Sequence, residues 1–208
     1  MRRSYGARGL DEADLAPTWL EQLTGWLEHA VQAGVPEPNA MVLATAGADG
    51  APGARTVLLK ALDERGLAFY TNLRSRKGRE IDANPRAALA FVWLTLERQV
   101  VVDGALEPVA AEEADAYYAS RPHGAKLAAL ASPQSEVIAS RSALEQRYAE
   151  LAERHPEGSS VGRPEWWGGH RLVPSTVEFW QGRENRLHDR LRYRRTSTGA
   201  WVVERLAP

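Results

Sequence analysis

The spacing of apolar residues changes from helical to strand-like along this chain. Residues 11–33 carry apolar side chains at helical spacing, and Gly34 and Pro36 follow as stop signals, so we predict a helix there. Beyond it, turn-forming residues such as Gly50 and Gly66 separate short apolar runs, which is the pattern of a strand meander. We predict strands at residues 41–46, 54–62, 67–71, 87–94, 99–109, 171–180, 186–195 and 201–206, the fifth interrupted by Gly104.

Helical patterns return at three places between these strands. We predict helices at residues 77–84, 111–120 and 142–154, the last opened by a capping box of Ser142 and Glu145. The polar residues that follow, up to Pro164, are the best candidate for a mobile loop. No internal repeat and no long linker divides the chain, so we expect a single domain over residues 1–208. The short turns indicate a mainly β fold with flanking helices (α+β), in the form of a mostly antiparallel β-barrel.

Composition excludes several classes of protein. The 208-residue chain has a formal net charge of −1, so no overall basic field attracts it to nucleic acid or to a membrane surface. It has no cysteine, which excludes disulfides, thiolate metal sites and a cysteine nucleophile, and we expect no bound metal. Its longest apolar runs are too short for a membrane span, and its first residues lack the apolar region of a secretory signal. We therefore expect a cytoplasmic protein.

The segment 178–190 carries the densest candidate chemistry. If its last residues are extended, Arg186, His188 and Arg190 point to one face, because side chains alternate along a strand. Two permanent cations around an imidazole suit an anionic ligand and can also handle a proton. Trp180, just upstream, could wall a planar ligand. The alternative is a solvated, arginine-rich edge strand that discourages edge-to-edge pairing.

A second basic cluster precedes the predicted helix at residues 77–84. The strand that runs from Arg55 to Lys60 has a cation at each end, and the two lie on opposite faces. The segment 69–78 then brings hydroxyl, arginine and lysine groups to the amino end of the helix. Such groups suit a phosphate monoester. On this segment alone, a surface loop without a ligand is an equally good interpretation.

Six motifs occur in order along the chain: Arg55-Thr-Val-Leu-Leu-Lys60, Phe69-Tyr-Thr-Asn72 with Ser75-Arg-Lys-Gly78, Glu97-Arg-Gln-Val100, Tyr117-Tyr-Ala-Ser-Arg-Pro122, Gln134-Ser135 and the segment 180–190. Together they closely resemble the pyridoxamine/pyridoxine 5'-phosphate oxidase family, and the resemblance covers essentially the whole chain. It implies a homodimer of split β-barrels that binds two FMN molecules at the subunit interface. The implied reaction is the oxidation of pyridoxamine 5'-phosphate and pyridoxine 5'-phosphate by dioxygen to pyridoxal 5'-phosphate, with release of hydrogen peroxide, and of ammonia from the amine.

The resemblance implies roles for individual residues. Arg186 and His188 match the catalytic pair that lies over the substrate ring beside the flavin. Arg2 and Tyr5 match an amino-terminal segment, residues 1–10 here, that folds over bound substrate as a lid.

The two phosphate groups have separate implied contacts. The substrate phosphate is held at positions matched by Lys60, Tyr117 and Arg121. The flavin contacts match Arg55, Thr56, Val57, Leu58, Leu59, Lys60, Tyr70, Thr71, Arg76, Lys77, Gln99, Gln134, Ser135, Trp180 and Arg190.

The chain departs from the family pattern beside the substrate phosphate. The family usually has a serine where this chain has Ala125, and losing one hydrogen bond to a charged group costs about 1.5–3 kcal/mol. Lys126 is a candidate to compensate, and the usual tryptophan nearby is replaced in the stretch 128–130. Two alternatives therefore stay open. One is a related split-barrel flavoprotein with another substrate or reductant, and the other is a non-catalytic module that binds pyridoxal phosphate or RNA through the arginines of residues 183–195.

Overall fold

In the computed structural model, which describes residues 9–208, the strands form one nine-stranded sheet with antiparallel pairing throughout. The predicted fold class is confirmed. The strands are β1 (Ala40–Ala46), β2 (Pro52–Leu58), β3 (Ala61–Asp63), β4 (Gly66–Asn72), β5 (Arg86–Trp93), β6 (Arg98–Pro108), β7 (Trp167–Gln181), β8 (Asp189–Arg195) and β9 (Trp201–Arg205).

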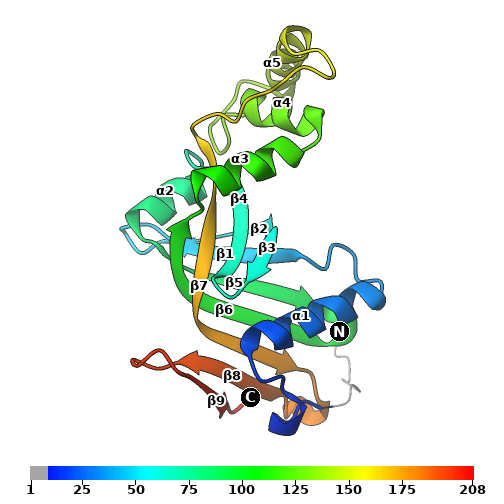
Figure 1. Cartoon of the computed structure of the whole chain (residues 1–208), viewed down its shortest axis with the longest axis vertical. Coiled ribbons are helices and arrows are strands. Elements are labelled where there is room, and N and C mark those ends of the chain that lie inside the picture. Colours follow the sequence, from blue (N-terminus) through cyan, green and yellow to red (C-terminus); the bar gives the residue numbers. More distant parts are fainter. Residues whose placement is uncertain (1–8) are drawn as a thin grey trace.

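The long strand β7 organises the sheet. One of its edges pairs with β6, while the other pairs first with β4 and then, further along, with β8. The order is β2-β1-β5-β6-β7-β4-β3, and β9 adds to β8. In β6 the register shifts between Asp103 and Gly104, opposite Pro174, which has no amide proton to donate. The predicted interruption at Gly104 is confirmed, and the bent sheet forms a half-barrel (Figure 1).

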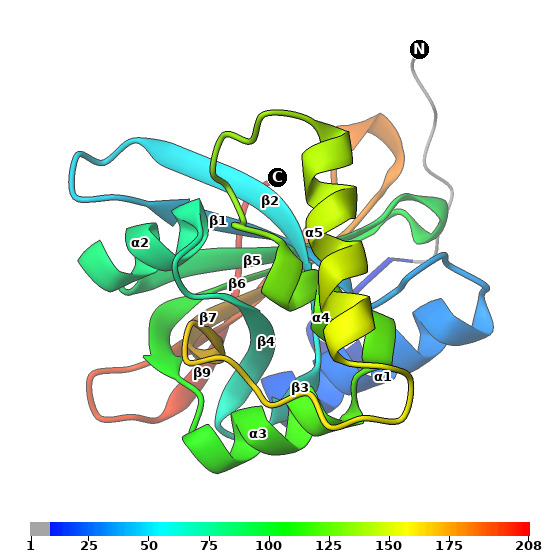
Figure 2. The same ribbon diagram turned by 90° about the horizontal axis from the view of Figure 1, so that it is seen from above.

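Five α-helices and three short 3-10 helices accompany the sheet in the described part of the chain. One helix lies across the strands, and three others stack beyond the end of the sheet that is remote from β8 and β9 (Figures 1 and 2). The helices are α1 (Trp19–Gln32), α2 (Arg76–Ala83), α3 (Ala111–Ser120), α4 (His123–Ala131), α5 (Arg141–Arg154), η1 (Glu12–Asp14), η2 (Leu94–Leu96) and η3 (Glu184–Arg186).

Helix α1 starts later than predicted because two separate caps occur in its predicted range. Asp11 caps only η1, whereas Thr18 and Glu21 form the capping box from which α1 begins. The buried face of α1 packs on the sheet, and Trp26 meets Phe179 of β7 edge to face at 5.1 Å between ring centroids. Both α1 tryptophans, Trp19 and Trp26, belong to the hydrophobic core.

Other boundaries also differ from the prediction. The range 54–62 forms two strands, and α5 is capped by Ser140 rather than Ser142. Helix α4 was not predicted, although Leu127 and Ala131, one turn apart, are its buried residues. None of the helices in residues 9–208 combines the length and the apolarity that a membrane span requires.

Candidate active site

A cavity of about 650 Å³ lies between β2, β4, the start of β7 and the helices α3 and α4. Residues far apart in the sequence meet there because β4 pairs with β7 and because α3 and α4 stand over the ends of these strands (Figure 2). The lining residues predicted from the sequence are Thr56, Val57, Leu58, Lys60, Tyr70, Thr71, Lys77, Tyr117, Arg121 and Gln134.

Three nearly parallel aromatic rings form one wall of the cavity. The centroid of Tyr70 lies 4.1 Å from that of Tyr117 and 5.4 Å from that of Trp167, with interplanar angles of 18° and 6°. Gly169, directly opposite Tyr70 in the β4–β7 ladder, makes room for this ring, since an added Cβ would lie 2.7 Å from a Tyr70 ring carbon. Sequence reasoning missed Trp167, which lies four residues before the predicted strand 171–180 and begins β7 in the structure.

Arg121 is the clearest sign of an anionic ligand. Its Nη2 donates to the Ala125 carbonyl at 3.0 Å, while its buried Nη1 has no hydrogen-bond partner among the described residues. The guanidinium lies 5.0 Å from the centroid of Trp167, and Lys60 Nζ lies 5.9 Å from that of Tyr117. A buried donor without a partner is costly, so this end of the cavity suits an oxyanion that accepts its hydrogen bond.

Lys77 forms the cationic part of the opposite wall. Its Nζ donates to Gln134 Oε1 at 2.8 Å and to Thr71 Oγ1 at 3.2 Å, and Ser75 caps the helix α2 that carries it. Burial lowers the pKa of Lys77, and the charge of Arg55 lowers it further. With Lys60 and Arg121, the cavity has three cations and no carboxylate among its described lining residues.

Arg55 and Arg76 do not line the cavity but bind a shared carboxylate behind it. Glu80 lies 2.8 Å from Arg55 Nη2 and 2.7 Å from Arg76 Nε, and it accepts a hydrogen bond from the Thr45 hydroxyl. Burial alone would raise the pKa of Glu80, but the hydrogen bonds from Thr45, Arg76 and Arg55 outweigh it and hold the pKa at about 2. Sequence reasoning missed Glu80, for which the spacing of four residues from Arg76 was the available signal.

The remaining candidates lie at the far end of β7. Trp180 is the cross-strand partner of both Gln99 and Arg190, and its ring lies 4.7 Å from that of His188. Arg190 forms an ion pair with Glu178, at 2.8 Å from Arg190 Nε to Glu178 Oε1. Trp167 and Trp180 stand near opposite ends of the 15-residue β7, so one chain alone does not bring these residues to the cavity.

The predicted common face of Arg186, His188 and Arg190 is wrong. Strand β8 begins only at Asp189, and Arg186 lies in the turn η3, where Asn185 and Arg186 have φ of 55° and 63°. The alternation of a strand therefore does not apply to Arg186 and His188.

Two further predicted positions, Leu59 and Ser135, do not line the cavity. Leu59 packs against the core, and Ser135 lies between α4 and α5 with φ of 74°. Arg2 and Tyr5 fall outside the described residues. Lys126 does not compensate for Ala125, because its Nζ donates to the Ala119 carbonyl and it does not line the cavity.

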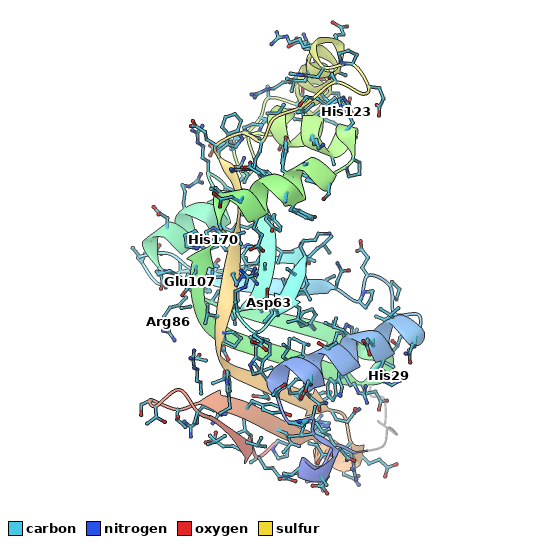
Figure 3. The ribbon with its side chains drawn as sticks, viewed as in Figure 1. His29, Asp63, Arg86, Glu107, His123 and His170 are labelled. Carbon is cyan, nitrogen blue, oxygen red and sulfur yellow. The ribbon has the colours of Figure 1, made fainter. Side chains whose placement is uncertain are left out.

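Histidines offer no metal centre in the described structure. His29, His123 and His170 belong to separate elements and lie well apart (Figure 3). Within residues 9–208, no group of three or more histidine, aspartate or glutamate side chains is arranged to hold a metal ion.

A curved antiparallel half-barrel with a cationic, aromatic-walled cavity at one end defines the class of FMN-binding split barrels. The sequence agrees, because residues 27–155 match the family model for pyridoxamine 5'-phosphate oxidase. Residues 167–208 match the model for the pyridoxine 5'-phosphate oxidase C-terminal dimerisation region. The chain belongs to the pyridoxamine 5'-phosphate oxidase family.

Individual relatives support this assignment. The pyridoxine/pyridoxamine 5'-phosphate oxidase of Frankia alni is 59% identical over 100% of this chain and 87% of its own length. That of Cupriavidus pinatubonensis is 54% identical over 100% of this chain and 97% of its own. Among solved structures, PhzG from Burkholderia lata, in complex with tetrahydrophenazine-1-carboxylic acid, has a TM-score of 0.91 at 33% identity and covers 99% of this chain and 100% of its own. A related FMN-binding protein from Nostoc punctiforme, at 22% identity, has a TM-score of 0.71 over 93% of this chain and 99% of its own, which supports the fold.

Proposed function

We propose that this protein is a cytoplasmic, FMN-dependent oxidase that converts pyridoxamine 5'-phosphate and pyridoxine 5'-phosphate to pyridoxal 5'-phosphate, the last step in the synthesis and salvage of that cofactor. Dioxygen is the electron acceptor and is reduced to hydrogen peroxide, and the amine substrate also releases ammonia. The observation that carries the proposal is the buried Nη1 of Arg121, which has no hydrogen-bond partner within residues 9–208 and lies in a cavity walled by Tyr70, Tyr117 and Trp167. A cavity with this cation and these aromatic walls suits a ligand that consists of a planar ring and a phosphate group.

The residues around Lys77 fit the flavin. Its phosphate is a dianion, and the Lys77 ammonium, the hydroxyl of Thr71 and the amino end of α2 are donors of the kind that such a group needs. Arg55 and Arg76 stand behind them as further cations. When bound, FMN accepts a hydride equivalent from the substrate and passes two electrons to dioxygen.

A second set of residues would bind and orient the substrate. Lys60, Tyr117 and Arg121 would hold the substrate phosphate, and the aromatic wall would exclude water from the ring. Arg186 would orient the ring, and His188 would contact a ring substituent. Arg2 and Tyr5 would cover the bound substrate.

The separation of the two residue groups supports a homodimer as part of the proposal. The cavity residues and the group of Gln99, Trp180, Arg186, His188 and Arg190 stand at opposite ends of β7, and in the proposed dimer a second copy supplies the latter group. The match to a dimerisation region over residues 167–208 supports this arrangement.

The test measures the flavin absorbance of the purified protein and its formation of hydrogen peroxide and of the aldehyde product. The purified protein is expected to show a flavin spectrum and, with either substrate in air, to form peroxide and pyridoxal 5'-phosphate in equal amounts. Arg121→Gln should lower the affinity for the substrate by about tenfold or more while the flavin content stays unchanged. Protein that carries flavin but oxidises neither substrate would contradict the proposed substrate, and protein that binds no flavin would contradict the whole proposal.

A different substrate on the same scaffold is the second candidate. Ala125, Ala128 and Ala129 all line the cavity, where larger or hydroxylated side chains would reduce its volume or bind phosphate. This small-residue wall leaves space for a bulkier ring system. Anaerobic bleaching of the flavin by a multi-ring substrate, with no bleaching by pyridoxine 5'-phosphate, would favour this candidate.

A further inference from the structure

The ring of His188 is held by the chain in a way that selects one of its two neutral tautomers. The backbone N–H of Arg183 donates to His188 Nδ1 at a distance of 3.1 Å. A nitrogen that accepts a hydrogen bond carries no proton, so a neutral ring must carry its proton on Nε2. The ring also contacts Trp180 in a tilted arrangement, with 4.7 Å between centroids and 46° between the ring planes, which limits its rotation.

The side chain of Arg183, whose backbone donates to His188, belongs to an ion-pair network. Arg183 Nη1 lies 3.3 Å from Asp189 Oδ2, and Asp189 Oδ1 lies 2.9 Å from Arg205 Nη1 on β9. The Leu10 N–H donates to Asp189 Oδ2 at 3.0 Å, and Gly9 packs so closely on Arg183 that an added Cβ would lie 1.6 Å from its Nη1. The start of β8, the end of β9 and residues 9 and 10 thus restrict the position of the Arg183 side chain.

We infer that Arg183, fixed by Asp189 and Arg205, holds His188 as the Nε2–H tautomer, so that His188 meets the substrate as a hydrogen-bond donor and not as a proton acceptor. This inference rests on the proposed function, in which His188 contacts a ring substituent. Nε2–H donates to an oxygen on the substrate ring and orients it. Arg183 and Asp189 are positioning residues, since they act through His188.

The tautomer is tested first, without any turnover. Nitrogen-15 spectra of the flavin-loaded protein at mildly alkaline pH distinguish a protonated Nε2 from a protonated Nδ1, and the His188 signals are assigned by their loss in His188→Gln. We expect an unprotonated Nδ1 and a protonated Nε2. A protonated Nδ1, or a mixture of both tautomers, would overturn the inference. Because substrate is absent, this result is independent of whether the proposed reaction occurs.

Two substitutions of His188 then test the donor role. The glutamine amide places an N–H donor near the position of Nε2, whereas the shorter asparagine amide reaches only the position of Nδ1. His188→Gln should keep kcat/KM within about tenfold of the wild type, the size of one neutral hydrogen bond. The kcat/KM of His188→Asn should be well below that of His188→Gln. Losses of about a hundredfold or more in both variants would indicate a general base and would overturn the donor role.

The positioning role needs a matched pair of variants. Asp189→Asn weakens the hold on Arg183, while Glu204→Gln breaks a comparable network with Arg192 and Arg194 on the same two strands without contacting His188. Asp189→Asn should make the Nδ1–H tautomer visible and lower kcat/KM, and Glu204→Gln should change neither. Equal effects of the two variants, or an unchanged tautomer in Asp189→Asn, would show that the network does not position His188.

Discussion

The Glu80 carboxylate lies 2.8 Å from the Arg55 guanidinium and joins helix α2 to strand β2 behind the cavity. The same carboxylate binds Arg76 at 2.7 Å and the Thr45 hydroxyl, so one acid on the helix stabilises two of the cations beside the proposed flavin phosphate. Arg55 in turn acts on Lys77, whose pKa it lowers. Glu80 therefore offsets part of the repulsion among three cations.

Replacement of Glu80 should destabilise the protein. Glu80→Gln is expected to lower the free energy of unfolding at neutral pH by about 1–3 kcal/mol, less than for a fully buried pair because the Arg76 side chain is exposed. Denaturant titration measures the difference. Glu145→Gln, which breaks the exposed pair with Arg141 on α5, is the control and should cost less than about 0.5 kcal/mol.

The contribution of Glu80 should also depend on pH. Its pKa is about 2 in the folded protein against an ordinary value of 4.5, so its stabilising effect is complete above pH 4.5 and is lost as the pH falls towards 2. The stability difference between the wild type and Glu80→Gln should therefore shrink over this range. A difference that stays constant from neutral pH down to pH 2 would contradict the assigned ion pairs.

Lys77 should show opposite effects on stability and on flavin binding. Because burial lowers its pKa, the charged form opposes folding, and the stability of the wild type should rise as the pH increases through the lowered pKa towards 10.5. Lys77→Met should raise the melting temperature of the flavin-free protein. It should also weaken FMN binding by about tenfold or more, as titration of the flavin-free protein would show. Lys126→Met, which does not alter the cavity lining, is the control and should leave FMN affinity unchanged.

Ala125→Ser should strengthen the binding of the substrate phosphate. The position lines the cavity, and its carbonyl already accepts from Arg121 Nη2, so an added hydroxyl lies close to the proposed phosphate. We expect the affinity for pyridoxine 5'-phosphate to rise by about tenfold, the effect of one hydrogen bond to a charged group. Pyridoxine without the phosphate is the control ligand. An equal gain in affinity for both ligands would show that the substrate phosphate does not bind beside residue 125.

Gly169→Ala should disturb the aromatic wall. The new Cβ would lie 2.7 Å from a Tyr70 ring carbon, so the ring must leave its stack with Tyr117 and Trp167. We expect a loss of about 1–3 kcal/mol in stability together with weaker FMN binding. Gly162→Ala, where no atom lies within 4 Å of the added Cβ, is the control and should change neither. Unchanged flavin binding in Gly169→Ala would show that Tyr70 does not form part of the flavin site.

Much of the architecture could be predicted from local pattern. The hairpins β1–β2 and β5–β6, the interruption at Gly104 and helix α3 all follow from apolar spacing and turn residues, which act over short distances. Helix α4 was missed because a short alanine-rich segment after Pro122 has little amphipathic signal. Residues 186–188 were predicted as strand because sequence pattern does not reveal the left-handed backbone at Asn185 and Arg186.

The sequence by itself determined the fold class, the family and the kinds of side chain available to the site. The reason is that the order of the motifs and the identity of each side chain are properties of the sequence alone. Only the tertiary structure decided which groups meet. Pairing of β4 with β7 brings Trp167 to Tyr70, and packing of α2 against β1, the neighbour of β2 in the sheet, brings Glu80 to Arg55. It also sets Arg186 and His188 at the opposite end of β7 from the cavity. The reason is that such contacts depend on strand register and on loop conformation, which many distant residues fix together.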